Sequence, residues 1–81
     1  MTVEEAKKEI FRVIVESTET ELEVTEDTSL VKDMGLSSVE VFVLLGDLED
    51  AFGIRIPASE LRQIRTAGEL CRLVISILKG K

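Results

Sequence analysis

Apolar residues recur every three or four positions along three stretches of the chain, a spacing that is typical of amphipathic helices. The first stretch covers residues 3–17, the second runs from Ser38 to about Phe52, and the third runs from Thr66 to Gly80. No stretch alternates between apolar and polar residues as a half-buried strand would. The pattern therefore predicts three longer helices and no sheet.

Each predicted helix opens with the same polar pattern, in which a serine or threonine is followed three residues later by a glutamate. The pairs are Thr2 and Glu5, Ser37 and Glu40, and Thr66 and Glu69. In such a capping box the hydroxyl accepts a hydrogen bond from a free backbone N–H, and the glutamate accepts one in return. Gly53 follows the second stretch and suits the left-handed conformation in which many helices end.

Two connections complete the predicted architecture. A short helical segment starts at Ile56-Pro57, because proline suits a first helical turn, and it turns Leu61 and Ile64 inward. The longest connection, residues 18–36, is long for a small domain. Its apolar residues, which we expect to anchor it to the core, are Leu22, Val24, Leu30 and Val31. The prediction is one all-α domain over residues 1–81, a small four-helix bundle with a long first loop.

The second predicted helix is apolar on two sides. The first side is a core stripe made of Val41, Leu44, Leu45, Leu48 and Phe52. The second side, which we call the second face, lies on the side of Ser38 and consists of Val39, Phe42, Val43, Gly46, Glu49 and Asp50. Either the short segment and the long loop cover the second face, or it is exposed. We favour an exposed face that binds partner proteins, because apolar residues rimmed by acids are typical of such sites.

Composition excludes several classes of function. The 81 residues carry a net charge of −6, which opposes binding to DNA, RNA and anionic membrane surfaces. The chain has no histidine, and its single cysteine, Cys71, is expected to be a buried, inert thiol in a reducing compartment. No apolar run reaches the length of a membrane span, and no metal-binding motif is present. We therefore expect a cytoplasmic monomer that is not an enzyme and binds no metal.

Charge is distributed unevenly along the chain. Residues 1–52 hold 14 acids and 4 bases, whereas residues 53–81 hold 2 acids and 6 bases. Between Asp33 and Ile54 there are five acids and no base. Such a segment is either a solvated surface or a docking surface for basic partners, and the sequence leaves both interpretations open.

Ser38 is the clearest candidate for a functional residue. Because Ser37 is the natural N-cap, Ser38 falls at the first helical position, beside unpaired N–H groups and the positive end of the helix dipole. A phosphate attached there would be favourably placed, and Gly35 would let another enzyme approach the backbone closely. From these residues alone, a serine pair that simply begins a helix is the simpler interpretation.

Four segments add a family resemblance. Residues 33–39 (DMGLSSV) resemble the carrier-protein signature D-[LM]-G-x-D-S-[LIV], and residues 47–57 (DLEDAFGIRIP) resemble the stretch L-E-x-x-F-x-I-x-I-P. Residues 25–30 (TEDTSL) are similar to the end of the family's first loop, and residues 66–70 (TAGEL) to the start of its last helix. The chain thus resembles the acyl carrier proteins, including peptidyl and other thiol-template carriers, over almost its whole length.

The resemblance implies a 4′-phosphopantetheine arm on the motif serine, which is Ser38 by position. A phosphopantetheinyl transferase would move the arm from coenzyme A, and the thiol of the arm would hold acyl groups as thioesters. Partner enzymes, acyl ligases or synthases of fatty-acid, polyketide or related biosynthesis with basic docking patches, would bind the second face. Two departures, Ser37 for the usual aspartate and Val43 for a common acid, leave the pathway open. The alternative is a carrier-like interaction module without a prosthetic group.

Overall fold

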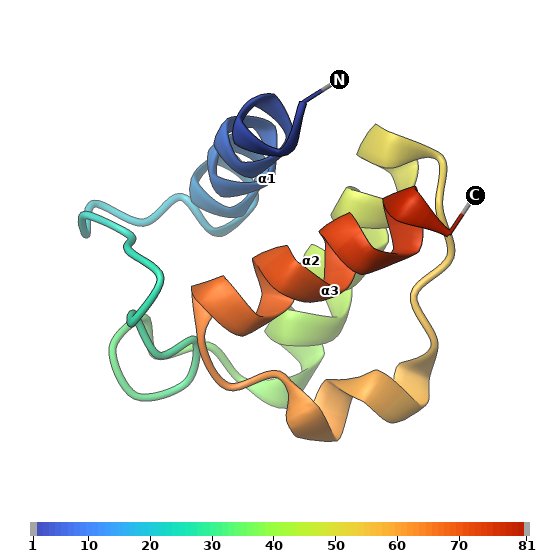
Figure 1. The fold of residues 1–81 in the computed structure, drawn as a ribbon. Helices are drawn as coiled ribbons and strands as arrows, with labels where there is room; N and C mark the ends of the chain where they lie inside the picture. Colours follow the sequence, from blue (N-terminus) through green and yellow to red (C-terminus); the bar gives the residue numbers. More distant parts are fainter. Residues whose placement is uncertain (1, 81) are drawn as a thin grey trace.

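The computed structural model describes residues 2–80, and its regular elements are helices (Figure 1). In chain order they are α1 (Val3–Thr18), α2 (Ser38–Phe52), the 3₁₀ helix η1 (Ala58–Gln63) and α3 (Ala67–Lys79). Within residues 2–80 the only strand-like feature is a single antiparallel bridge between Ser29 and Thr66. The prediction of an all-α fold with three longer helices and one short helix is confirmed. Across the same residues, no helix has the length and apolar character needed to cross a bilayer.

The three capping boxes explain where the long helices begin. The hydroxyls of Thr2, Ser37 and Thr66 each accept a hydrogen bond from the glutamate N–H three residues later, and each glutamate carboxylate accepts one from the N-cap N–H. Replacing such a cap by alanine typically costs about 1 kcal/mol. At the other end of α2, Gly53 has φ 63° and ends the helix in the left-handed region, as its position predicts.

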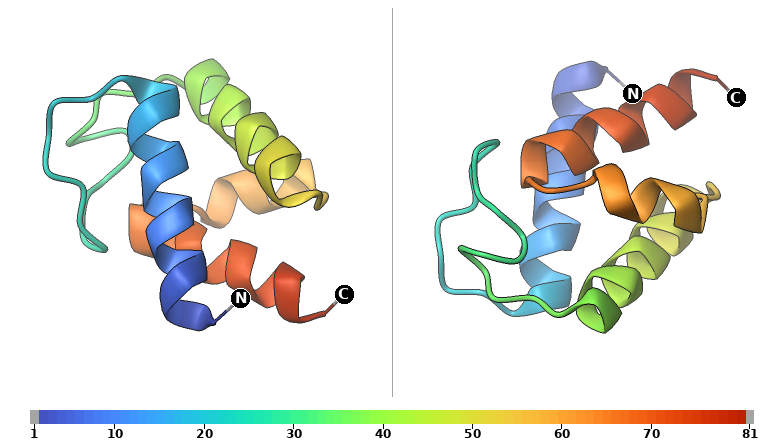
Figure 2. Two further views of the ribbon diagram at one scale, coloured as in Figure 1. Left: turned by 90° about the horizontal axis from the view of Figure 1, so that it is seen from above. Right: turned by 90° about the horizontal axis from the view of Figure 1, so that it is seen from below.

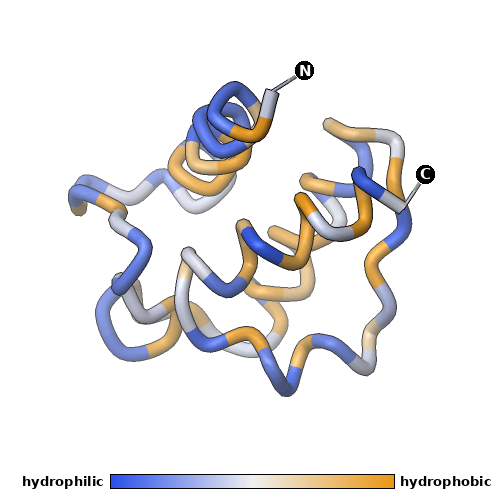
Figure 3. Tube along the Cα trace, viewed as in Figure 1, coloured by the Kyte–Doolittle hydropathy of each residue, from blue (hydrophilic) through white to orange (hydrophobic). Residues whose placement is uncertain are grey.

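The core lies where the inner sides of the three long helices meet. α1 packs against both α2 and α3: its C-terminal end lies beside the start of α2, and its N-terminal end lies beside the end of α3 (Figure 2). Apolar residues of all three helices turn toward this centre (Figure 3). The fully buried side chains include Ile10, Ile14, Leu44, Leu48, Leu70, Cys71 and Val74. Burial raises the pKa of the Cys71 thiol, which agrees with the expected inert cysteine.

The long loop of residues 19–37 is attached to the core differently from the prediction. Leu30 is buried and Val24 packs against the core, as expected, but Leu22 and Val31 are 48% and 60% exposed. The anchor prediction is therefore wrong for Leu22 and Val31. Their side chains are not needed as anchors, because the backbone N–H of Leu30 donates to the carbonyl of Arg65 at 3.0 Å.

The short helix also differs slightly from the prediction. Pro57 lies at the N-cap of η1 rather than inside its first turn, and its carbonyl accepts the N–H of Glu60 at 3.0 Å. Its ψ of 137° is extended, so the helical turns begin at Ala58. Ile64 is buried just after η1, and Leu61 is half-buried, so both face inward as predicted.

Candidate functional site

The segment that leads to Ser38 is held by hydrogen bonds within the loop. The Asp33 carboxylate accepts the Ser29 N–H at 2.7 Å, and the Ser29 carbonyl accepts the N–H groups of Asp33 and Met34. The Leu36 N–H then donates to the Leu30 carbonyl at 3.0 Å, and Leu36 is buried. The start of α2 is therefore fixed in place on both sides of Gly35. The sequence analysis did not assign this role to Asp33, although its four-residue spacing from Ser29 is a usable signal.

Gly35 serves this segment through its backbone conformation. Its φ is +70°, which places it in the left-handed region that favours glycine. A Cβ built at this position would meet no atom within 4 Å. The turn itself therefore favours glycine, and close approach by another enzyme at Gly35 stays a prediction.

The two serines at the start of α2 have different surroundings. The Ser37 hydroxyl accepts the Glu40 N–H at 3.2 Å, and the Glu40 carboxylate accepts the Ser37 N–H at 3.1 Å. The Ser38 side chain is exposed and makes no hydrogen bond to any residue between 2 and 80. The backbone N–H groups of Ser38 and Val39 likewise find no acceptor in that part of the chain. Ser38 therefore presents an uncommitted hydroxyl beside two free N–H donors, where an attached anion would be stabilised.

The second face is exposed at its apolar positions. Val39 is 72% exposed, Phe42 57% and Val43 56%, while Gly46 is half-buried. On the opposite side of α2, Val41, Leu44, Leu45 and Leu48 are buried. Neither η1 nor the long loop covers the second face, so the expectation of an exposed apolar surface next to Ser38 is confirmed.

Most acids of the segment between Asp33 and Ile54, which contains no base, accept hydrogen bonds from other residues of the chain. Asp47 accepts a hydrogen bond from the Ser17 hydroxyl of α1, and Glu40 caps its own helix. The half-buried Glu49 accepts the Ile56 N–H at 2.6 Å and so holds the turn between α2 and η1. Asp50 is exposed and has no hydrogen-bond partner in the described chain. The acidic run is therefore partly structural, which neither sequence interpretation anticipated.

The described residues contain no cluster of three or more side chains suited to hold a metal ion. The chemistry available at the start of α2 is that of an accessible hydroxyl next to an apolar surface. Such a hydroxyl can carry a phosphodiester, and the apolar surface can contact whichever protein installs or uses the attached group.

Comparison with known proteins agrees with this chemistry. Residues 8–74 match the family model described as "Phosphopantetheine attachment site", whose members carry covalent 4′-phosphopantetheine. A solved structure from Mycobacterium tuberculosis, described as that of an acyl carrier protein, is 30% identical with a TM-score of 0.80. That match covers 88% of this chain and 96% of the other. The family model spans most of the chain, and the fold and the exposed serine fit it: this chain belongs to the acyl carrier protein family and is a phosphopantetheine carrier.

Proposed function

We propose that Ser38 is the residue to which 4′-phosphopantetheine is attached, and that the protein carries acyl groups as thioesters. The observation that supports this choice is the contrast between the two serines. The hydroxyl of Ser37 is occupied as a helix cap, whereas the hydroxyl of Ser38 is exposed and uncommitted. Ser38 also occupies the serine position of the carrier signature, in register with Phe52 and Pro57.

The residues around Ser38 fit a phosphodiester. The free N–H groups of Ser38 and Val39 form part of the positive end of the α2 dipole, which favours an anion by about 0.3–1 kcal/mol at an exposed site. Glu40, the nearest acid in the helix, turns its carboxylate back to the Ser37 N–H. When bound, the prosthetic group supplies a terminal thiol that holds the acyl group as a thioester.

The second face is the proposed docking surface for partner enzymes. Val39, Phe42 and Val43 are exposed beside Ser38, and Gly46 extends the surface toward Asp50. An apolar surface with an acidic edge is complementary to a partner patch that is apolar with a basic edge. Glu49 belongs to the edge of this face, where it also holds Ile56. The proposed partners are a phosphopantetheinyl transferase and acyl ligases or synthases with basic patches.

The cargo is proposed to be an acyl intermediate of fatty-acid, polyketide or related biosynthesis. Val43 makes the middle of the second face apolar, where fatty-acid carriers commonly have an acid, and this favours partners specialised for such a surface. In this proposal the protein is a cytoplasmic monomer, and its partner enzymes perform the catalysis. Without histidine, the chain offers no imidazole base of its own.

The test is transfer of the prosthetic group in vitro. Apo protein is incubated with coenzyme A, Mg²⁺ and a broad-specificity phosphopantetheinyl transferase, and the product is examined by intact mass and peptide mapping. The wild type should gain one phosphopantetheine on Ser38, and Ser38→Ala should gain none. The matched control is Ser37→Asp, which removes the neighbouring hydroxyl but keeps a good N-cap, and it should be loaded.

Two results would contradict the proposal. An adduct mapped to Ser37, or loading of Ser38→Ala, would move the attachment residue. No mass gain in any variant, together with partner binding that Phe42→Ala weakens, would instead support an interaction module without a prosthetic group.

A further inference from the structure

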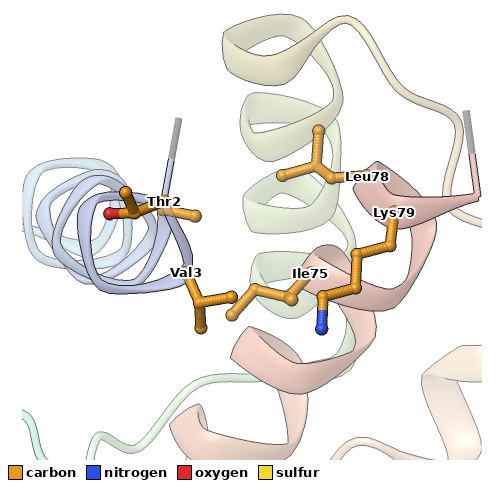
Figure 4. Close-up of a pocket in the computed structure, with 6 residues that line it drawn as sticks. Thr2, Val3, Ile75, Leu78 and Lys79 are labelled. Carbon is orange, nitrogen blue, oxygen red and sulfur yellow. The ribbon is translucent and has the colours of Figure 1, made fainter.

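A second apolar surface lies at the end of α1 that is remote from Ser38. There the first turns of α1 and the last turns of α3 enclose a groove of about 360 Å³, which we call the α1–α3 groove (Figure 4). Val3 and Ile75 point toward each other across it, and Leu78 lies beside them. An adjoining hollow of about 420 Å³ continues the groove past Lys7 and Arg72.

The floor of the α1–α3 groove is apolar and only partly covered. Val3 is 46% exposed, and Ile75 and Leu78 are half-buried, while Ala6 lies buried beneath them. Ile75 packs against the edge of the core from α3. Because Ile75 is only half-buried there, part of its apolar side chain remains open to the groove.

The rim of the α1–α3 groove is basic, in a protein whose net charge is −6. Lys79 lines the groove itself, and Lys7 and Arg72 line the adjoining hollow, where the only acid among the lining residues is Glu26. The Glu26 carboxylate is already paired with the Lys7 ammonium at 2.9 Å. Arg72 and Lys79 form no ion pair with any residue in the described part of the chain. The rim thus keeps two cations for an external acid.

We propose that the α1–α3 groove binds an acidic amphipathic helix of a partner protein. The floor accepts apolar side chains, the cations of the rim pair with carboxylates, and the space between two helices suits a third helix. Arg72, Ile75 and Lys79 lie along one side of α3 over roughly 10 Å, which matches about two turns of a bound helix.

The position of the α1–α3 groove is compatible with the proposed carrier role but does not depend on it. α1 separates the groove at Val3 from the Ser38 end of the bundle at Thr18, a rise of roughly 22 Å along the helix. A partner held in the groove leaves Ser38 and the second face accessible. Such a tether raises the local concentration of the carrier near that partner without occupying the loading site.

The test uses a defined probe, a synthetic 18-residue amphipathic peptide with leucines on one side and glutamates on the other. Binding to the full-length protein is measured by calorimetry in low salt and mapped by amide NMR shifts. We expect saturable binding with shifts in the first turns of α1 and the last turns of α3. A matched peptide with every glutamate replaced by lysine should not bind.

Variants of the protein locate the site. The double variant Arg72→Glu, Lys79→Glu changes two exposed side chains of the rim and should weaken binding at least tenfold. The control Arg62→Glu, Arg65→Glu makes the same charge change at exposed positions outside the groove and should alter the affinity less than twofold. Val3→Ser removes apolar contact at an exposed first-turn position and should weaken binding about fivefold.

Several outcomes would overturn the proposal. These are equal weakening by both double variants, shifts confined to α2, or no binding of the acidic peptide. Concentration-dependent dimerisation through the groove, measured by sedimentation, would make a second copy the occupant. Binding of the protein to vesicles of anionic lipid that Arg72→Glu, Lys79→Glu abolishes would make a membrane the occupant. Ser38→Ala should bind the acidic peptide like wild type, so failure here is separable from failure of the Ser38 assignment.

Discussion

α2 and α3 begin with the same chemistry but in different surroundings. Both have a hydroxyl N-cap and a glutamate at the third helical position. At the start of α3, the N–H groups of Ala67 and Gly68 donate to the carbonyls of Thr28 and Glu26 at 2.9 and 3.0 Å. The corresponding N–H groups of α2 find no acceptor among residues 2–80. One helix start is closed by the long loop, and the other is left open.

The contrast shows that a capping box determines where a helix begins but not whether that start is accessible. Accessibility is decided by the path of residues 19–37, which pair with the start of α3 and then continue into α2. The two helices also differ in how far their apolar side chains are covered. α3 buries Leu70 and Val74, whereas α2 leaves Phe42 and Val43 exposed next to its open start.

The largest effect is expected from adding a side chain at the start of α3, where the long loop pairs with the helix. Gly68 lies at the second position of α3, where an added Cβ would come within 2.7 Å of the Glu26 carbonyl oxygen. Gly68→Ala gains about 1 kcal/mol of helix propensity but forces backbone to move, which in packed sites costs about 1–3 kcal/mol. We expect a net loss of up to about 2 kcal/mol in the free energy of unfolding, measured by urea denaturation.

Val39 occupies the same position in α2 and provides the matched control. It is 72% exposed, so Val39→Ala should change the free energy of unfolding by less than about 0.5 kcal/mol. A similar loss in both variants would show that the two helix starts do not differ as described.

A second glycine tests the open surface. Gly46 lies inside α2 on the second face, and a Cβ there would meet no atom within 4 Å. Gly46→Ala should therefore stabilise the protein by about 0.5–1 kcal/mol, because alanine favours the helix and nothing opposes the methyl group. Thermal unfolding would reveal the gain. A decrease in Tm would mean that something already covers this side of α2.

The smallest effect is expected from the ion pair between Lys7 and Glu26, which lies beside the start of α3. The Lys7 ammonium, through its hydrogen bond and its charge, lowers the pKa of the Glu26 carboxyl below 4.5. Glu26 in turn raises the pKa of Lys7 above 10.5. Because the Glu26 pKa is lower in the folded state, its contribution is present above pH 4.5 and is lost as pH falls through the folded-state value. Since the Lys7 pKa is raised, its contribution disappears as pH rises through that value.

Lys7→Met should therefore lower Tm slightly at neutral pH, as expected for an exposed pair. The difference from wild type should shrink at acid pH and in high salt. Arg12→Met, which removes two exposed ion pairs within α1, those with Glu9 and Glu16, gives the comparison for charge loss without a contact to the loop. A difference that persists below pH 3 would assign the effect of Lys7→Met to packing.

The helices and the inner side of α2 could be predicted from sequence because their causes are local. Capping boxes act over three residues, Gly53 ends α2 by its own φ, and apolar spacing identifies Leu44 and Leu48 as core. The exposed second face was also predictable, because so small a bundle has few elements with which to cover two sides of one helix. The position of Ser38 followed from the identification of Ser37 as the cap.

The roles that could not be predicted depend on contacts between distant residues. The exposure of Leu22 and Val31 follows from backbone pairing of the loop with the start of α3, which apolar spacing does not reveal. From the sequence Glu49 is expected to be a surface acid, yet its carboxylate accepts a hydrogen bond from the Ile56 N–H across the turn. The α1–α3 groove depends on the crossing of two helices, and Ile75 alone gave no signal of it.

The burial of Cys71 has a practical consequence. The chain has one cysteine, and its sulfur is fully enclosed by the bundle, with a pKa raised by that enclosure. In the native protein we expect a maleimide or disulfide reagent to react with this side chain far more slowly than with an exposed thiol. The amount of reagent consumed before denaturation would therefore measure the thiols of the attached pantetheine. The enclosed Cys71 would also be kept from forming a disulfide with the thiol of the arm.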